Sequence, residues 1–190
     1  MGSLLQGVNL YLIGMMGVGK TTVGRLLAKQ LSYGFVDTDD VIAQAAGKSI
    51  NLIFAEEGEA AFRHLESDVL SKVCAFTKLT IATGGGIVLR RENWSYLHHG
   101  LIVWLDAPVE LIYSRLAEDI TRPLLQDVDP QGKLRSLLEQ RQSLYAQADI
   151  RIAIVEGETP EQIATRVIEA IPSVLKKPVS HHEENVLTDY

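Results

Sequence analysis

The strongest constraint on the fold is an eight-residue turn near the N-terminus, GMMGVGKT at positions 14–21. It follows an apolar run at 8–13 and precedes a helical pattern that begins at Thr21. This is the G-x-x-x-x-G-K-[ST] loop, in the strand–loop–helix setting that its mechanism requires. Its glycines let backbone N–H groups approach phosphate oxygens closely, and the helix N-terminus adds further donors. Lys20 is placed to reach the outer phosphates of a nucleotide, and Thr21 offers a hydroxyl to Mg²⁺.

Composition restricts the class of protein. A chain of 190 residues is expected to form one domain, and it can bury roughly 70% of its unfolded surface without a metal or disulfide. A net charge of −6 and the lack of a basic run argue against nucleic-acid or membrane binding. The single cysteine, Cys74, excludes an intrachain disulfide framework. With no secretory signal and no long apolar span, we expect a cytoplasmic protein, and nothing in the sequence demands a partner chain, so we expect a monomer.

Strand and helix patterns alternate along the chain. Short apolar runs predict strands at 8–13, 34–36, 79–83, 101–105 and 150–155. Apolar stripes at helical spacing predict the intervening helices at 21–31, 41–46, 50–57, 59–75, about 94–97, 108–118, 133–148 and 160–171. This alternation indicates an α/β fold, with a mainly parallel sheet covered by helices on both faces.

Two segments do not fit this alternation. Residues 118–132 are polar and contain two prolines, which predicts a long mobile loop. From Pro172 onward the pattern is lost in polar and charged residues, so the domain is predicted to span 1–172 and 173–190 to be a disordered tail.

A phosphate loop alone fits a GTPase, a motor, a transporter ATPase or a small-molecule kinase. The GTPase interpretation requires a base-specifying N-K-x-D, which the sequence lacks. The chain is also short for an ATPase that couples hydrolysis to movement. A compact kinase, which must bind a small acceptor and exclude water, is the interpretation that remains.

Acidic residues follow the second predicted strand. Asp37 and Asp39 stand two positions apart at its end, beside the expected phosphate loop. One carboxylate could hold Mg²⁺ or its water, and the other could accept a proton or hydrogen bond from a substrate hydroxyl. A solvated acidic turn is the alternative.

Arginines and glycines predict an acceptor site. Arg63 and Arg141 occupy or adjoin apolar helical stripes, and two converging arginine forks would recognise a carboxylate. A structural ion pair, such as Arg63 with Glu66, is equally compatible with the spacing. The glycines at 84–86 follow a strand, which suggests that a ligand approaches the backbone there. Arg122, in the predicted mobile loop, could neutralise charge on a transferring phosphoryl group, although a lone loop arginine is usually only solvated.

Taken in order, these stretches resemble the shikimate kinase family, within the nucleoside-monophosphate-kinase-like group of P-loop proteins. The resemblance covers about 8–171 and rests on the following segments: GMMGVGKT at 14–21, FVDTD at 35–39, GEAAFR at 58–63 followed by Glu66, ATGGG at 82–86, TRPLL at 121–125, and Arg141 four residues before Tyr145. It implies a three-layer fold with strand order 2-3-1-4-5, a helical substrate-binding insert near 38–68 and a lid near 117–129.

The resemblance also implies an activity, in which ATP phosphorylates the 3-hydroxyl of shikimate with Mg²⁺ on the route to aromatic amino acids. Lys20, Asp39 and Arg122 would be the catalytic residues, and Glu66 would fix Arg63. The metal would be held by Thr21 and, through water, by Asp37. The implied ATP-binding residues are Gly14, Gly17, Val18, Gly19, Lys20, Thr21, Thr22, Arg115 and Arg122, and the implied shikimate-binding residues are Asp39, Arg63, Gly84, Gly85, Gly86 and Arg141.

Two alternatives stay open at this point. The residue chemistry alone would equally allow another small hydroxy acid, such as gluconate, as the acceptor. A catalytically silent binding protein could also keep the fold, but such a relative is expected to lose Lys20, Asp39 or the arginines, and this chain has them all. The loop at 156–159, EGET, departs from the family because many members have a basic residue there.

Overall fold

The computed structural model describes residues 4–117 and 128–175. Five parallel strands form one sheet in the order β2-β3-β1-β4-β5, which confirms the predicted order. The strands are β1 (Leu10–Ile13), β2 (Gly34–Asp37), β3 (Leu79–Ala82), β4 (Leu101–Asp106) and β5 (Ile150–Ala153).

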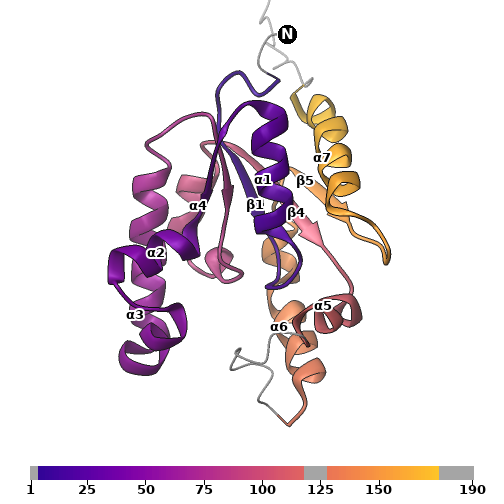
Figure 1. Cartoon of the computed structure of the whole chain (residues 1–190). Coiled ribbons are helices and arrows are strands. Elements are labelled where there is room, and N and C mark those ends of the chain that lie inside the picture. Colours follow the sequence, from indigo (N-terminus) through magenta and orange to yellow (C-terminus); the bar gives the residue numbers. More distant parts are fainter. Residues whose placement is uncertain (1–3, 118–127, 176–190) are drawn as a thin grey trace, which may run out of the picture.

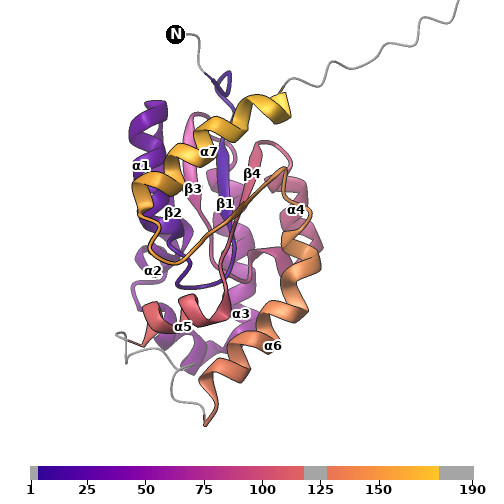
Figure 2. The ribbon, with the colours of Figure 1, turned by 90° about the vertical axis from the view of Figure 1, so that its right-hand side faces the viewer.

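Seven α-helices and one short 3₁₀ helix are described around this sheet. They are α1 (Lys20–Leu31), α2 (Thr38–Ala46), α3 (Ile50–Val73), η1 (Ile87–Leu89), α4 (Arg91–Leu97), α5 (Val109–Leu116), α6 (Pro130–Tyr145) and α7 (Pro160–Leu175). Helices α1 and α7 lie on one side of the sheet, and α4 and α6 lie on the other (Figures 1 and 2).

The central strand explains why the sheet needs cover on both faces. All four residues of β1 are completely buried, because their alternating side chains point into the two helical layers. Apolar runs of this kind belong in the middle of a parallel sheet. The carboxyl end of β1 therefore opens directly into the phosphate loop, at the edge where ligands bind in open α/β sheets.

Some predicted boundaries differ from the structure. The helix predicted at 133–148 runs instead from Pro130 to Tyr145, because Asp129 caps it by accepting a hydrogen bond from the Gly132 N–H at 2.9 Å. Helix α7 passes through Pro172 and ends at Leu175, so the predicted tail begins within it. Of the predicted lid, 118–127 lie outside the described residues. The division into one domain, an insert, a lid and a tail otherwise stays a prediction.

The predicted break between two helices at Gly58 is present as a kink. Gly58 has φ 81° and ψ 172°, and it divides α3 into the two segments that the sequence predicts. An L-residue rarely adopts this backbone conformation, so glycine suits the position. Within 4–117 and 128–175, no helix has both the length and the apolar character needed to cross a membrane.

Candidate active site

The phosphate loop is fixed by close backbone contact with β4. Gly14 has φ 139°, and a Cβ at this position would lie 2.4 Å from the Leu105 carbonyl oxygen, so only glycine fits. The buried Lys20 side chain folds back over the loop, and its Nζ donates to the carbonyl oxygens of Gly14 and Met15 at 2.8 Å each. The ammonium group is therefore held over the turn where phosphates would lie.

Thr21 and Asp37 meet at the edge of this loop. The Thr21 hydroxyl donates to Asp37 Oδ2 at 2.7 Å, although the residues are 16 positions apart. Asp37 Oδ1 accepts from the Asp39 N–H at 3.0 Å, so Asp37 also caps α2. The described residues contain no cluster of three or more His, Cys, Asp or Glu side chains suited to a metal. A hydroxyl beside one carboxylate nevertheless fits Mg²⁺, which takes few protein oxygens and completes its shell with water and nucleotide phosphates.

Two carboxyl groups approach each other across Gly84. A Cβ at Gly84 would lie 2.5 Å from Glu66 Oε1 and 3.0 Å from Asp39 Oδ1. Both oxygens are buried and have no hydrogen-bond partner in the described structure. Burial, followed by the charge of Asp37, raises the pKa of Asp39. Burial also raises the pKa of Glu66, against the opposing effect of Arg63. Two buried carboxyl oxygens without a partner among the described residues are free to accept hydrogen bonds from hydroxyl groups that enter beside Gly84.

Arg63 and Arg141 border the same glycines. Arg63 donates to Glu66 Oε2 at 2.8 Å, while the Glu66 side chain has no exposed surface. A Cβ at Gly86 would lie 2.2 Å from the Arg63 guanidinium, so the glycine makes room for it. Arg141 is buried and donates to the Gly85 carbonyl oxygen at 3.2 Å. The two arginines, more than 70 positions apart, therefore converge on the 84–86 segment.

The glycines at 84–86 lie directly against the phosphate loop. A Cβ at Gly85 would lie 3.2 Å from the Met16 backbone nitrogen and 3.5 Å from the Gly14 carbonyl oxygen. The segment is also tied to α2, because the Gly84 N–H donates to the Thr38 hydroxyl at 3.1 Å. A phosphate on the loop and an acceptor on the glycines would thus be neighbours.

Sequence reasoning missed several residues that build this site. Thr38 holds Gly84, and the buried Thr83 hydroxyl donates to the Leu12 carbonyl oxygen at 2.9 Å, joining β3 to the end of β1. Tyr145 donates to the Gly85 carbonyl oxygen at 2.6 Å. The position of Tyr145 one turn after Arg141, on the same helical stripe, was the available signal, because residues at that spacing share a face.

The remaining predicted site residues are placed as follows. Arg115 donates to the Val18 carbonyl oxygen at 2.9 Å, which sets its guanidinium against the phosphate loop. Gly17, Gly19 and Thr22 lie in the loop or at the start of α1. Arg122 lies outside the described residues. The contacts of all these side chains with ligands stay predictions.

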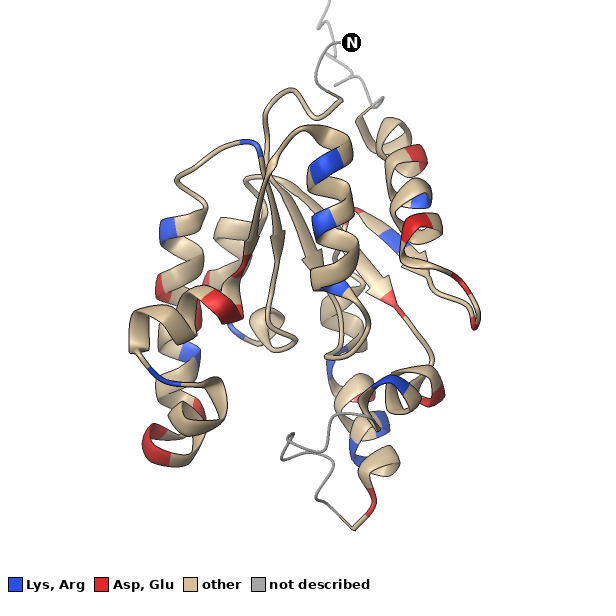
Figure 3. Cartoon of the chain, in the orientation of Figure 1, with Lys and Arg blue, Asp and Glu red and all other residues tan. Residues whose placement is uncertain are grey.

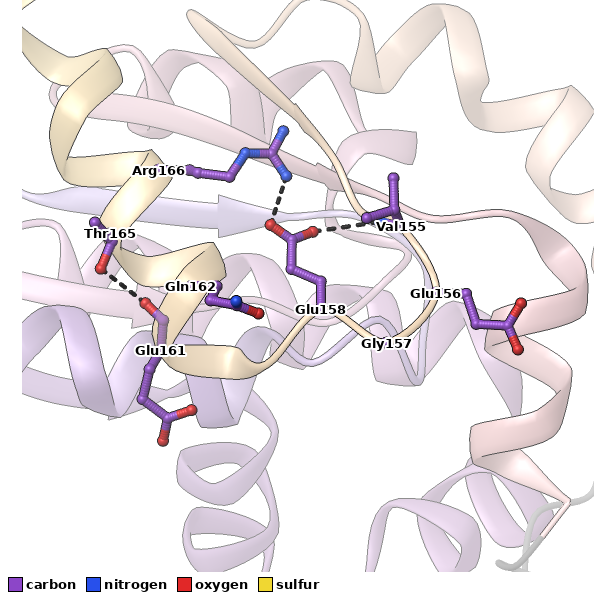
Figure 4. A pocket seen from close by; sticks show the side chains of 8 residues that line it. All are labelled: Val155, Glu156, Gly157, Glu158, Glu161, Gln162, Thr165 and Arg166. Carbon is purple, nitrogen blue, oxygen red and sulfur yellow. Dashed lines mark hydrogen bonds and ion pairs between the residues drawn. The ribbon is translucent and has the colours of Figure 1, made fainter.

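The loop at 156–159 forms the wall of a separate cavity of about 660 Å³, lined by Val155, Glu156, Gly157, Glu158, Glu161, Gln162, Thr165 and Arg166 (Figure 4). Glu158 crosses the base of this loop, because it accepts from Arg166 at 2.7 Å and from the Val155 N–H at 3.2 Å. Burial opposes ionisation of Glu158, but the Arg166 hydrogen bond prevails and lowers its pKa. Three glutamates against one arginine make this cavity unsuited to phosphates or carboxylates.

Charge at the phosphate-loop site has the opposite balance. Lys20, Arg63, Arg115 and Arg141 come from four helices, α1, α3, α5 and α6, which all carry basic positions (Figure 3). The carboxylates at this site are those of Asp37, Asp39 and Glu66, and the charges of Lys20, Arg63 and Arg141 act on Asp39 or Glu66. These features define a P-loop kinase for a small anionic acceptor: a parallel sheet that carries the phosphate loop, a pair of side chains compatible with Mg²⁺, and two arginines at one glycine segment.

The comparisons with known proteins identify the family within this class. A family model described as shikimate kinase matches residues 16–172. A shikimate kinase of Nostoc punctiforme is 78% identical over 181 residues, which are 95% of this chain and 100% of that protein. The shikimate kinase of another Nostoc species is 75% identical over the same share of each chain. A structure of the Acinetobacter baumannii shikimate kinase in complex with shikimate matches with a TM-score of 0.86 and 39% identity, covering 92% of this chain and 98% of that one. The chain belongs to the shikimate kinase family, and it is an ATP-dependent small-molecule kinase.

Proposed function

We propose that this chain transfers the γ-phosphate of ATP to the 3-hydroxyl of shikimate, giving shikimate 3-phosphate and ADP. The carrying observation is that Arg63, Arg141 and the Asp39 carboxyl border one glycine segment, which itself touches the phosphate loop. Shikimate offers one carboxylate for the two arginine forks and several hydroxyls for the carboxyl oxygens. In that pose its hydroxyl end faces the γ-phosphate.

The transfer step assigns roles to this chain's residues. The acceptor hydroxyl oxygen attacks the γ-phosphorus, and the bond between this phosphorus and the β-phosphate oxygen breaks. Asp39 orients the attacking hydroxyl and takes its proton, for which the burial-raised pKa of Asp39 makes it a better acceptor. Lys20 would leave the loop carbonyls for the phosphoryl oxygens, and Arg122, which lies outside the described residues, would join it there.

The residues that would hold Mg²⁺ are Thr21, through its hydroxyl, and Asp37, through water. The ion would neutralise charge on the β- and γ-phosphates when it is bound. The hydrogen bond between the two side chains supports this role, because it holds both oxygens at the same edge of the loop. We also propose that the enzyme acts as a monomer in the cytoplasm, in line with its acidic charge and single cysteine.

The decisive assay gives ATP–Mg²⁺ to the full chain with shikimate, gluconate or a nucleoside monophosphate, and follows ADP release. We expect fast release only with shikimate and slow hydrolysis with ATP alone, because acceptor binding completes the site. Comparable or faster release with gluconate would overturn the choice of acceptor. Absence of acceptor-dependent release with all three would favour a catalytically silent binding protein.

A further inference from the structure

The hydroxyl of Tyr145 stands at the junction of the donor and acceptor segments. It donates to the Gly85 carbonyl oxygen at 2.6 Å and lies 3.6 Å from the Met15 sulfur in the phosphate loop. The Tyr145 side chain has no exposed surface, and its ring stacks on Trp104 of β4 with centroids 5.8 Å apart. The proposed transfer gives this residue no role.

A bond to the Gly85 carbonyl has a consequence for the acceptor. In a trans peptide the C=O of one residue and the N–H of the next point in opposite directions. Fixing the Gly85 oxygen therefore fixes the direction of the Gly86 N–H, which has no hydrogen-bond partner among the described residues. This N–H lies on the segment that also makes room for the Arg63 guanidinium.

Arg141 shares the same carbonyl, but its contact is the longer of the two. Its guanidinium donates to the Gly85 oxygen at 3.2 Å, compared with 2.6 Å for the Tyr145 hydroxyl. If Arg141 turns its fork toward an acceptor carboxylate, the hydroxyl is the donor that keeps the carbonyl in place. Burial raises the pKa of Tyr145, so the hydroxyl keeps its proton and stays a donor over the working pH range.

We propose that Tyr145 is a positioning residue, which holds the acceptor glycines in register with the phosphate loop while Arg141 binds the acceptor. This inference rests on the proposed function, because it assigns the acceptor to the 84–86 segment. In the proposed transfer, Tyr145 contacts neither the phosphoryl group nor the proton of the acceptor hydroxyl. Its effect should therefore pass through the geometry of Gly85 and Gly86.

Tyr145→Phe tests the inference, since it removes the hydroxyl and leaves the ring that stacks on Trp104. Tyr11→Phe is the matched control: Tyr11 is equally buried, on β1, and the described structure shows no hydrogen bond from its hydroxyl to either loop. We expect Tyr145→Phe to lower kcat by about tenfold and to raise the shikimate KM several-fold, since near-attack geometry is lost. The ATP KM should stay within about twofold, and Tyr11→Phe should match the wild type.

Thermal unfolding of both variants separates positioning from folding. If Tyr145→Phe loses activity only in proportion to its folded fraction, or matches Tyr11→Phe in kcat and KM, the inference is wrong. Should Tyr145→Phe not fold, Trp104→Phe keeps the hydroxyl but loosens its support, and an unchanged kcat in that variant would reject the inference. A wild-type enzyme without shikimate-dependent ADP release would instead reject the proposed function.

Discussion

Glu66 shows how a single buried residue can shape the proposed acceptor site. Its side chain has no exposed surface. One carboxylate oxygen accepts a hydrogen bond from Arg63, and the other has no partner in the described structure. An ionised carboxylate in such a place costs free energy unless its partner is well aligned. The 2.8 Å bond to Arg63 offsets part of that cost and fixes the guanidinium, which we propose binds the acceptor.

The raised pKa of Glu66 leads to a prediction about stability and pH. A carboxyl group that binds its proton more tightly in the folded state stabilises the protein only while it is protonated. The protein therefore loses stability as the pH rises from the ordinary pKa of this group, 4.5, through its folded pKa. The Glu66→Gln variant has no proton to lose at this position. Its unfolding free energy, measured relative to that of the wild type, should therefore be higher at pH 8 than at pH 5, by about 1.4 kcal/mol for each unit by which the pKa of Glu66 is raised. Urea unfolding at the two pH values measures this difference in slope.

Glu59→Gln provides the matched control for this experiment. Glu59 contacts the same guanidinium at 3.2 Å, but its side chain is 63% exposed. Its replacement should leave the pH slope of the wild type intact, because an exposed ion pair contributes little. Equal slopes for all three proteins would show that burial of Glu66 does not oppose its ionisation.

Asp39 carries the second prediction about a residue. Asp39→Asn keeps the size of the side chain but removes the proton acceptor, so kcat should fall by about 10²–10⁴-fold. Nucleotide binding should change little, because the loop contacts of Lys20 and Thr21 are elsewhere. Steady-state kinetics and calorimetric titration with ADP test the two halves. Near-normal turnover would remove Asp39 from the catalytic residues.

Among the elements, the 84–86 segment links the two halves of the site. Each glycine of the segment lies against a different element. Gly84 donates to Thr38 of α2, Gly85 lies against the phosphate loop, and Gly86 lies against Arg63 of α3. Gly86 has an ordinary φ of −98°, so its need for glycine is steric rather than conformational. A larger residue at position 86 would place its side chain where the Arg63 guanidinium lies.

Gly86→Ala should therefore displace Arg63. The added methyl would lie 2.2 Å from the end of the Arg63 side chain, which must move, and this movement also weakens its ion pair with the buried Glu66 and lowers stability. We expect the shikimate KM to rise by about tenfold or more while the ATP KM stays close to that of the wild type. Gly34→Ala is the control, since Gly34 lies outside the left-handed region at the far end of β2 from Asp37, and a Cβ there would likewise meet the end of a side chain, Leu79, at 2.8 Å. A normal shikimate KM in Gly86→Ala would contradict the placement of Arg63.

The elements also show where prediction from sequence succeeds. The phosphate loop and its flanking strand and helix are encoded by adjacent residues, so the sequence predicts them directly. The Arg63–Glu66 pair is local too, because residues three apart share a helix face. The start of α6 could have been predicted from Asp129 followed by Pro130, a cap and a first-turn proline.

Contacts between segments that are distant in the sequence could not be predicted from residue spacing. Arg141 and Tyr145 meet Gly85 across 56 and 60 positions, and only the packing of α6 beside the sheet brings them there. Spacing alone left an acid-recognition site and a pair of structural ion pairs equally compatible with the arginines. The fold shows that Arg63 has an ion-pair partner and also borders the glycines, so the ion pair is observed and the acid-recognition site stays a prediction.

At the scale of the whole molecule, the sheet brings residues from separate helices to one edge. Arg141 on α6 and the loop before α1 belong to distant parts of the chain, yet both contact Gly85. An acceptor that binds both arginines would tie α3 to α6 across the end of the sheet. Such a ligand stabilises the folded state by mass action, because the unfolded chain has no such site.

Arg141→Met tests this coupling, because methionine keeps an apolar stem of similar length without the guanidinium. Shikimate at 100 times its Kd should raise the unfolding free energy of the wild type by about 2.7 kcal/mol, or roughly 5–10 °C in Tm for a domain of this size. Arg141→Met should lose most of that shift and keep the shift that ADP produces. Arg135→Met, on the same helix at a side chain that is 55% exposed, should keep both shifts. A full shikimate shift in Arg141→Met would mean that Arg63 and the glycines hold the acceptor without α6.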